Sequence, residues 1–373
     1  MDPYESIRQS IAIGKSMARI KRTSMKPTHT SPRRQHTGTR PHPLELKKDD
    51  EFWYDDGTII LISQNIEFRV YQGPLAQHSQ VFRNMLAFPQ PPIPGPSHAS
   101  SSRTTLGSGL VAPCPTVHLT DSPADLRHFL RALVLGGTIQ DPPPSLTFYA
   151  VCAWIRLGHK YEVDKLVENG LQYLRRFYPS TFTPDPEPPG IWAGPIRKDR
   201  PMDLQGRSAI AIVNLARLTD SNDLLPLALL ECCKLGADIV KGYRREDGTV
   251  EFLQPDDLGR CFAAKGALEL SVVNAYLRIF EHAPIDGSCD GGQSCVVAFH
   301  YLRYHFRVAT CEDVGVDELL VEDRMESDLT NTLCSQCRCT VISDAVQGKR
   351  VLFWNSLPNR FELDVVGWGV DWP

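Results

Sequence analysis

The sequence predicts an α+β fold: a small sheet with a helical cluster, followed by a mostly α-helical C-terminal domain. Residues 66–70 alternate between apolar and polar side chains, which is typical of a half-buried strand. Residues 75–86 then place their apolar side chains three and four positions apart, as a helix does. Helical spacing returns over residues 122–137, 145–178 and 208–235. A short β-rich segment followed by long helical stretches therefore predicts this fold class.

The strands are predicted to begin with a hairpin. Thr58–Ser63 is a run rich in β-branched residues, and a polar turn separates it from the alternating residues 66–70. Ser79 is expected to cap the helix that follows, since its hydroxyl can accept a hydrogen bond from an unpaired backbone N–H. Residues 116–119, "TVHL", are expected to form a further short strand.

Three helices are predicted after this strand. Ser122 stands at an N-cap position and Pro123 at the first helical position, while two glycines at 136–137 end the helix. Residues 145–178 are expected to form two more helices, hinged near Gly158.

Two proline-rich stretches divide the chain. The first, 88–116, is too polar and too rich in Pro, Ser and Gly to bury a core, so we expect a disordered insert. The second falls within residues 179–204 and is typical of an interdomain linker. The predicted organisation is a disordered basic arm at 1–48, a sheet-containing domain at 49–178 with the insert at 88–116, a linker at 179–204 and a helical domain at 205–373.

Charge is distributed unevenly along the chain. The net charge is −4, yet residues 1–48 hold eleven Lys and Arg against three Asp and Glu. This arm carries +8, so the remaining 325 residues carry −12. An acidic body binds a phosphate backbone poorly, so we do not expect nucleic acid as a partner of the folded region. The arm itself has the charge to reach nucleic acid or a nuclear import receptor.

The N-terminal residues are Ser- and Arg-rich and acid-poor, which faintly resembles an organelle transit peptide, and we interpret them as a disordered basic arm. No run approaches the roughly 18 consecutive apolar residues of a membrane span, and no uninterrupted apolar core of a secretory signal is present. We therefore expect an intracellular protein, in the nucleus or the cytoplasm, without a membrane segment. Eleven cysteines in such a chain indicate reduced thiols or a metal site rather than a disulfide framework.

Two cysteine pairs are the strongest candidates for chemistry. Cys334 and Cys337 have the Cys-x2-Cys spacing that supplies two zinc ligands from one tight turn, and Cys289 and Cys295 form a second pair with five residues between them. Zinc prefers four soft ligands in a tetrahedron, so these four would make one structural site that staples two segments together. The alternative is a set of buried free thiols.

Other residues could replace a member of this ligand set. They are His300, His305, Cys311 and Cys339. Adjacent Cys232 and Cys233 are interpreted as thiols of a helix core instead. The sequence contains no phosphate-binding loop, nucleotide-binding glycine motif, nucleophile elbow or His-Glu-x-x-His zinc motif. We therefore expect neither an enzyme nor a small-molecule substrate.

Three segments together resemble the BTB/POZ domain. They are "FRVYQGPLAQHSQVFRNML" (68–86), "HLTDSPADLRHFLRALVLGG" (118–137) and "LGHKYEVDKLVENGLQYL" (157–174). They follow one another in the family's order and cover about residues 49–178. Tyr71 departs from the pattern, since the family usually has His there.

The chain also resembles a group of BTB proteins abundant in mushroom-forming fungi, which continue with a helical region and a cysteine-bearing tail. Residues 208–235 are similar to their first helices after the domain. "NTLCSQC" (331–337) and "VLFWNSLPNRFEL" (351–363) are similar to their C-terminal signature. The usual final Pro-x-Trp is not matched, because Asp364 and Val365 follow Leu363.

The resemblance implies a non-enzymatic interaction protein whose BTB domain forms a homodimer or docks a protein partner. Leu75, Val81, Phe82 and Met85 are the candidate partner-binding residues, and core packing is their alternative role. A second hypothesis is a substrate adaptor for a cullin ubiquitin ligase. It is disfavoured because residues 87–118, where such domains often carry an acidic element, contain no Asp or Glu. A third is a transcriptional regulator that uses the basic arm.

Overall fold

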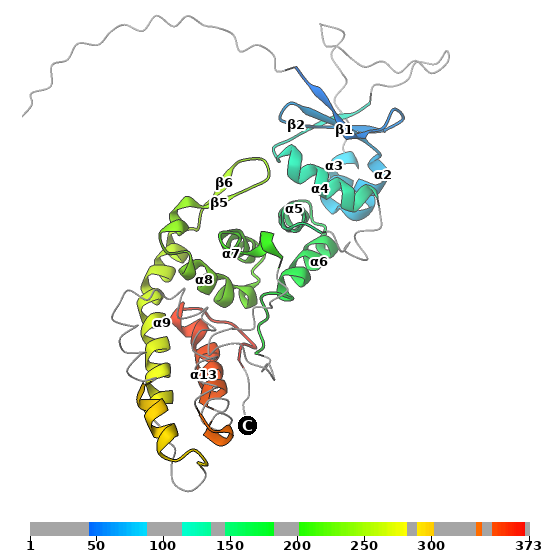
Figure 1. Ribbon diagram of the computed structural model, residues 1–373. Coiled ribbons are helices and arrows are strands. Elements are labelled where there is room, and N and C mark those ends of the chain that lie inside the picture. Colours follow the sequence, from blue (N-terminus) through cyan, green and yellow to red (C-terminus); the bar gives the residue numbers. More distant parts are fainter. Residues whose placement is uncertain are drawn as a thin grey trace, which may run out of the picture. The chain divides into compact units, whose positions relative to one another are not determined.

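The computed structural model describes residues 45–87, 114–135, 146–182, 201–281, 289–301, 333–337 and 345–369 (Figure 1). They form a small mixed sheet and many helices, which agrees with the predicted α+β class. All of them belong to one compact unit, Glu45–Pro373. Most of the predicted basic arm, insert and linker lies outside the described residues, so only the ends of these segments can be compared with the prediction.

The sheet has four strands in the order β1-β3-β2-β4. β2 (Ile59–Ser63) and β3 (Ile66–Val70) form the predicted antiparallel hairpin, in which Leu61 pairs with Phe68. β4 (Thr116–Leu119), also predicted, is parallel to β2 at one edge and begins at the last residue of the predicted insert. β1 (Lys47–Trp53) is parallel to β3 at the other edge.

β1 was not predicted, and it begins two residues inside the stretch assigned to the disordered arm. Among its residues only Asp49 and Phe52 are buried, and they are three positions apart rather than two. The Asp49 carboxylate accepts hydrogen bonds from the backbone N–H groups of Glu51 (3.1 Å) and Phe52 (2.9 Å). The register with β3 also shifts between Lys48 and Trp53. This irregularity removes the period of two by which a strand is identified in a sequence.

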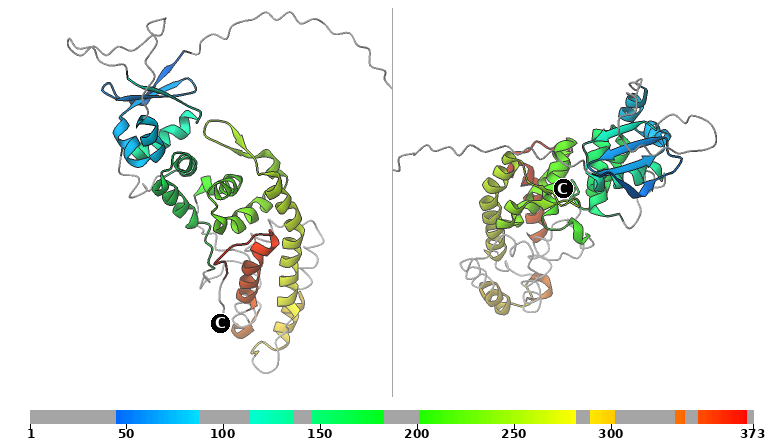
Figure 2. Two further views of the ribbon diagram at one scale, coloured as in Figure 1. Left: turned by 180° about the vertical axis from the view of Figure 1, so that it is seen from behind. Right: turned by 90° about the horizontal axis from the view of Figure 1, so that it is seen from above.

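Three helices pack on one side of the sheet (Figures 1 and 2): α2 (Gln72–His78), α3 (Gln80–Ala87) and α4 (Pro123–Val134). Ser79 caps α3 as predicted, because its Oγ accepts a hydrogen bond from the Phe82 N–H at 3.1 Å. Ser122 caps α4 in the same way through the Asp125 N–H at 3.1 Å. The buried residues gathered here form the sheet core: Phe52, Ile59, Leu61, Phe68, Val70, Leu75, Phe82, Leu126, Phe129, Leu130, Ala132, Leu133, Trp154, Leu157, Tyr161, Val163 and Leu166.

α5 (Phe148–Lys160) is shared between two cores. Trp154 and Leu157 belong to the sheet core, whereas Cys152 and Ile155 belong to a second, larger cluster. α6 (Asp164–Arg175) packs against α5. We call the second cluster the helical core; it contains Phe148, Val151, Cys152, Ile155, Leu171, Leu174, Tyr178, Phe182, Leu204 and the buried apolar residues within 209–268, 295–299, 333–337 and 351–361.

The two helices predicted over residues 145–178 are present, but the break between them does not fall at Gly158, near which it was predicted. Gly158 lies inside α5, and the break between the helices comes at residues 161–163. A Cβ atom on Gly158 would lie 2.8 Å from Val167 Cγ2 and 3.4 Å from the Val163 carbonyl oxygen. Glycine is present because α6 approaches α5 closely at this point, not because the chain bends there.

Replacing Gly158 by alanine should destabilise the chain by about 1–3 kcal/mol, because the added methyl group overpacks the contact with α6. The better helix propensity of alanine, about 1 kcal/mol, offsets only part of this. Urea unfolding measures the change. Gly259→Ala is the matched control, since a Cβ there meets nothing within 4 Å and should leave stability unchanged or raise it. A Gly158→Ala variant as stable as the control would contradict the close approach.

The C-terminal region is mostly helical, as predicted, and residues 208–235 form two helices. In chain order its elements are η2 (Met202–Leu204), α7 (Ser208–Leu218), η3 (Asn222–Leu224), α8 (Leu225–Lys234), η4 (Gly236–Lys241), the hairpin of β5 (Tyr243–Arg244) and β6 (Val250–Glu251), α9 (Pro255–Glu281), a helix over 293–301, and α13 (Ala345–Arg360).

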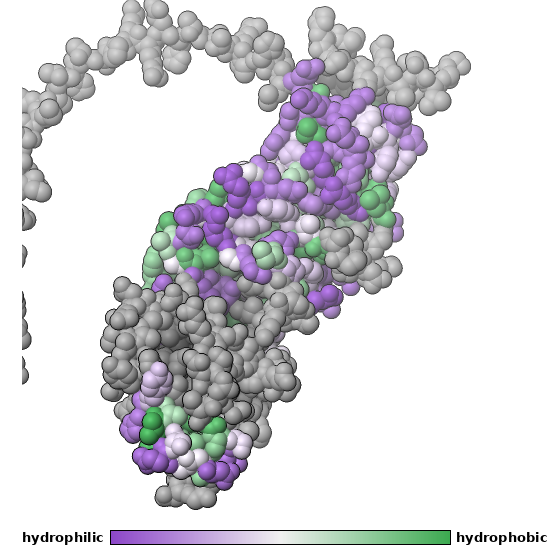
Figure 3. Space-filling view, in the orientation of Figure 1, coloured by the Kyte–Doolittle hydropathy of each residue, from purple (hydrophilic) through white to green (hydrophobic). Residues whose placement is uncertain are grey.

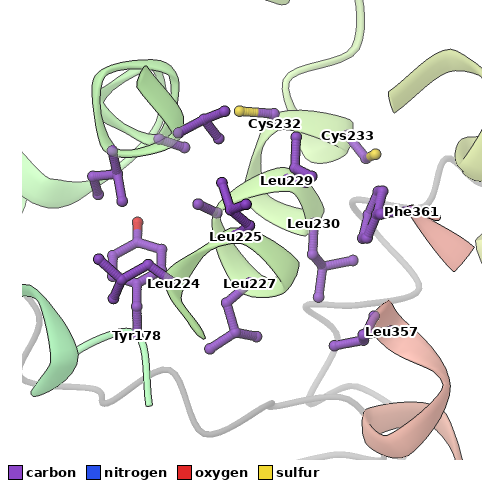
Figure 4. Packing of buried hydrophobic residues seen from close by; sticks show 14 of the residues in the cluster. Tyr178, Leu224, Leu225, Leu227, Leu229, Leu230, Cys232, Cys233, Leu357 and Phe361 are labelled. Atoms are coloured by element: carbon purple, nitrogen blue, oxygen red, sulfur yellow. The ribbon is translucent and has the colours of Figure 1, made fainter. Parts of the chain in front are cut away.

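α8 lies within the helical core and packs against α7, α9 and α13. Figure 4 shows its side chains gathered with Tyr178, Leu357 and Phe361, which come from distant parts of the chain. Cys232 and Cys233 are both buried on α8, as expected for thiols of a helix core. No helix in the described part of the chain is long and apolar enough to span a membrane.

The predicted linker does not separate two cores. Phe182 and Leu204, near its two ends, are both buried in the helical core. Because α5 and Tyr178 contribute to the same core, the predicted boundary at residue 178 crosses a continuous apolar cluster. Residues 146–182 are therefore packed with the C-terminal region as well as with the sheet.

Four charged side chains also join the two regions; we call them the charged bridge. Arg156 on α5 donates to Asp125 on α4 at 3.3 Å and to Glu251 on β6 at 2.5 Å. Arg245, which follows β5, also donates to Asp125. Beside them, His128 Nε2 lies 2.6 Å from Glu246 Oε2. The β5–β6 hairpin thus contacts α4 and α5 through ion pairs that span about 120 residues of sequence.

Candidate metal centre

The first cysteine pair is brought together by a tight turn. Cys289 precedes the turn at residues 290–292, and Cys295 lies in the first turn of the helix over 293–301. The Ser294 N–H donates to the Gly291 carbonyl at 3.1 Å, and Gly292 has a φ of +48°, which favours glycine. This reversal points both sulfurs of an unusual Cys-x5-Cys spacing into one site.

The second pair belongs to a single helical turn at residues 335–337: Cys334 directly precedes the turn and Cys337 is its last residue. The Cys337 N–H donates to the Cys334 sulfur at 3.4 Å, which is how a Cys-x2-Cys turn closes on its first ligand. The Cys334 N–H donates to the Cys295 sulfur at 3.3 Å. This last hydrogen bond connects segments that are 39 residues apart in the sequence.

The four sulfurs form one cluster, as predicted, and all lie within 4.8 Å of one another. Cys289 Sγ is 3.9 Å from Cys334 Sγ and 3.4 Å from Cys337 Sγ. A zinc–sulfur bond of about 2.3 Å in a tetrahedron gives sulfur–sulfur distances of about 3.8 Å, so the cluster has the size of a four-thiolate zinc site. All four cysteines are free thiols rather than disulfides.

Gly291 is a functional residue that the sequence analysis missed. A Cβ atom on Gly291 would lie 2.3 Å from Cys295 Sγ and 3.3 Å from Cys334 Cβ. Glycine is therefore the residue that lets the first turn pass over the sulfurs. The two adjacent glycines in "CDGGQSC" are the signal that could have indicated it.

Burial divides the cluster into an inner and an outer pair. Cys295 and Cys337 are buried in the helical core, next to Leu333, whereas Cys289 and Cys334 are half-buried. The inner pair anchors the site to the core. The outer pair lies toward solvent, which gives a metal ion a route into the site.

The thiols do not share one electrostatic environment. The pKa of Cys334 is lowered to about 6, mainly because the Cys337 backbone N–H donates to its sulfur. The pKa of Cys337 is raised, first by burial and then by hydrogen bonds with the neighbouring thiols. Four thiolates so close together repel one another, so a divalent cation is what allows all four to deprotonate.

The donor set fits zinc. Four sulfur ligands favour zinc over the hard cations calcium and magnesium, which take oxygen ligands. Four protein ligands fill a tetrahedral shell and leave no open position for water, which is the arrangement of structural rather than catalytic zinc sites. The backbone N–H groups of Cys334 and Cys337 would orient two of the sulfurs and offset their charge.

Only one of the four alternative zinc ligands can be compared with the structure. His300 lies in the described region, is exposed, and is not part of the four-sulfur group. His305, Cys311 and Cys339 lie outside the described residues.

The candidate partner-binding residues divide into two kinds. Leu75 and Phe82 have no exposed area and belong to the sheet core, so placing them on a docking surface was wrong: the helical spacing identified the core face. Val81 and Met85 are partly exposed beside that core. On the face shown in Figure 3, hydrophilic residues dominate the described surface, and hydrophobic residues appear as separate spots.

A scan of protein-family models finds no match to this chain, and a search of curated proteins finds none either. The residues and their geometry therefore carry the functional proposal.

Proposed function

We propose that the chain is a non-enzymatic protein-interaction protein whose C-terminal region is held by one structural zinc ion. The four-cysteine cluster is the observation that carries this proposal. Its ligands come from segments 39 residues apart, and two of them are buried in the helical core. A closed site of this kind fixes a surface in place and supplies no reacting atom.

The sheet-containing region is the proposed docking module, of the BTB/POZ type. The order of hairpin, two short helices, strand and helices supports this, together with the residue pattern of the three resembling segments. Half-exposed Val81 and Met85 on α3 are the members of the candidate set that a partner or a second copy can reach. The free thiols of the described residues are consistent with a reducing, intracellular environment.

Native mass spectrometry of the purified full chain tests the proposal, since it reports bound metal and subunit number together. We expect one zinc ion per chain and a dimer. A metal-free chain whose four cluster thiols all react with an alkylating reagent would contradict the zinc centre. A monomer at every concentration would contradict self-association and leave a different protein as the partner of the docking module.

A further inference from the structure

The outer pair of the cysteine cluster combines two properties that the inner pair lacks. Cys289 and Cys334 are half-buried, so they are the two thiols of the cluster that solvent can reach, whereas Cys295 is 1% exposed and Cys337 is 4% exposed. The outer thiols come from segments 45 residues apart, and their sulfurs lie 3.9 Å from each other. Because a disulfide bond brings two sulfurs to about 2.05 Å, a small movement of either turn is enough to form one.

Cys289 is the outer thiol whose sulfur is least stabilised as an anion. The sulfurs of Cys334 and Cys295 each accept a backbone N–H hydrogen bond, at 3.4 Å and 3.3 Å. Among the described residues, the hydrogen-bond partners of the Cys289 sulfur are only the thiols of Cys334 and Cys337. Stabilising the negative charge on a sulfur lowers the nucleophilicity of that sulfur. Cys289 therefore combines access to solvent with a sulfur that no backbone donor of the described residues stabilises.

We propose that the outer pair is an oxidation site for hydrogen peroxide, at which a disulfide bond between Cys289 and Cys334 replaces the zinc ion. This inference rests on the zinc centre of the proposed function. The Cys289 thiolate attacks one peroxide oxygen, and the O–O bond breaks to give a sulfenic acid and hydroxide. The Cys334 thiolate then attacks the sulfenic sulfur and expels a second hydroxide. The two sulfurs lose two electrons, which the peroxide accepts, and two protons from solvent convert both hydroxides into water.

The zinc ion leaves because only the inner pair still binds it. Cys295 and Cys337 supply two of the four ligands that a closed zinc site needs. The two segments nevertheless stay joined, since Cys289 belongs to one of them and Cys334 to the other. The chain thus exchanges a metal cross-link for a covalent one. A dithiol reductant reverses the change, because thiol–disulfide exchange returns both cysteines to thiols and the site can bind zinc again.

The other described thiols do not form a comparable pair. Cys232, Cys233 and Cys261 are at most 3% exposed, so an oxidant in solution does not reach them in the folded chain. Cys114 is half-buried, but its sulfur contacts the Gly57 carbonyl oxygen at 3.6 Å rather than a second thiol. Oxidation to a disulfide is therefore expected at the outer pair alone among these residues.

Treatment of the zinc-loaded full chain with hydrogen peroxide tests the proposal. A colorimetric chelator measures the released zinc, and peptide mass spectrometry after alkylation identifies the disulfide. We expect one zinc ion to be released for each disulfide formed between Cys289 and Cys334, with Cys295 and Cys337 alkylated once the oxidised chain is denatured. Zinc that stays bound throughout would overturn the proposal, and so would a disulfide between Cys334 and Cys337 in its place.

Cys289→His separates the reacting sulfur from the metal ligand. Histidine is a zinc ligand without an oxidisable thiol, so this variant should bind zinc and release it in peroxide more slowly by about tenfold or more. Cys114→Ser is the matched control and should release zinc at the wild-type rate. Equal rates in Cys289→His and the wild type would overturn the role of Cys289. If Cys289→His binds no zinc, the disulfide identified in the wild type decides alone.

The same experiment distinguishes failure of this inference from failure of the proposed function. A wild-type chain that takes up no zinc before peroxide is added contradicts the zinc centre itself. A wild-type chain that takes up one zinc ion and keeps it in peroxide contradicts only the oxidation site.

Discussion

Replacing Cys334 and Cys337 together by serine is expected to reduce bound zinc from one ion per chain to none and to lower the melting temperature of the chain. Structural zinc binds zinc-finger peptides with about 10–16 kcal/mol of apparent free energy. If only ~3 kcal/mol of this stabilises a chain that already has its own cores, the loss moves the melting temperature of the unit Glu45–Pro373 by roughly 4–5 °C. Metal analysis and differential scanning calorimetry measure the two effects.

The controls separate loss of metal from loss of a thiol. Cys114→Ser removes a half-buried thiol outside the cluster and should leave both the zinc content and the melting temperature unchanged. Gly291→Ala keeps all four ligands but adds a methyl group 2.3 Å from the Cys295 sulfur, so it should weaken zinc binding by about tenfold or more. If the double serine variant has the same melting temperature as the wild type, and a chelator does not change the melting temperature of the wild type, the proposal of a zinc centre is wrong.

Parts of the fold could be predicted because local signals agreed with the final structure. The hairpin of β2 and β3 follows directly from alternation, and the caps at Ser79 and Ser122 follow from hydroxyl chemistry. β1 could not be predicted, since its register with β3 shifts beside Asp49 and its buried residues are not two positions apart. The hairpin of β5 and β6 was also missed, because each strand has only two residues and the turn at Gly248 is its only signal.

The domain boundary predicted at residue 178 disagrees with the packing for a different reason. α5 is apolar on most of its circumference, and a sequence pattern does not tell which neighbour covers each side. In the structure Trp154 faces the sheet core and Ile155 faces the helical core, so a single helix joins both. The described ends of the proline-rich stretch, Phe182 and Leu204, both lie in the helical core, so the stretch did not mark the edge of a core.

The metal cluster was predicted from ligand chemistry rather than from fold. The Cys-x2-Cys pair has a spacing that one turn can close, and the second pair was chosen because zinc needs four ligands. The sequence did not predict the hydrogen bonds from the backbone N–H groups of Cys334 and Cys337 to sulfur, or the lack of space for a side chain at Gly291. These features depend on how the two turns approach each other.

Replacing Asp125 by alanine is the second change with a large expected effect. Asp125 is 6% exposed and accepts hydrogen bonds from both Arg156 and Arg245. Removing one member of a buried ion-pair network costs about 3–5 kcal/mol when its partners are left uncompensated. Here Glu251 stays 2.5 Å from Arg156 and 3.4 Å from Arg245, so one carboxylate would have to compensate two guanidinium groups. The arginine side chains also keep some contact with water, so we expect roughly 3 kcal/mol, or a fall in melting temperature of about 4–5 °C for the unit Glu45–Pro373.

The variant also tests how the two regions are joined. Because the charged bridge and the shared helix α5 connect the sheet-containing and C-terminal regions, the wild type should unfold in one cooperative transition. Asp125→Ala combined with Arg245→Gln should destabilise less than the sum of the single changes, since each removes a partner of the other. Asp55→Asn, an exposed acid in a turn, is the control and should change little. Additive effects of Asp125 and Arg245, or two separate transitions in the wild type, would show that the bridge does not hold the regions together.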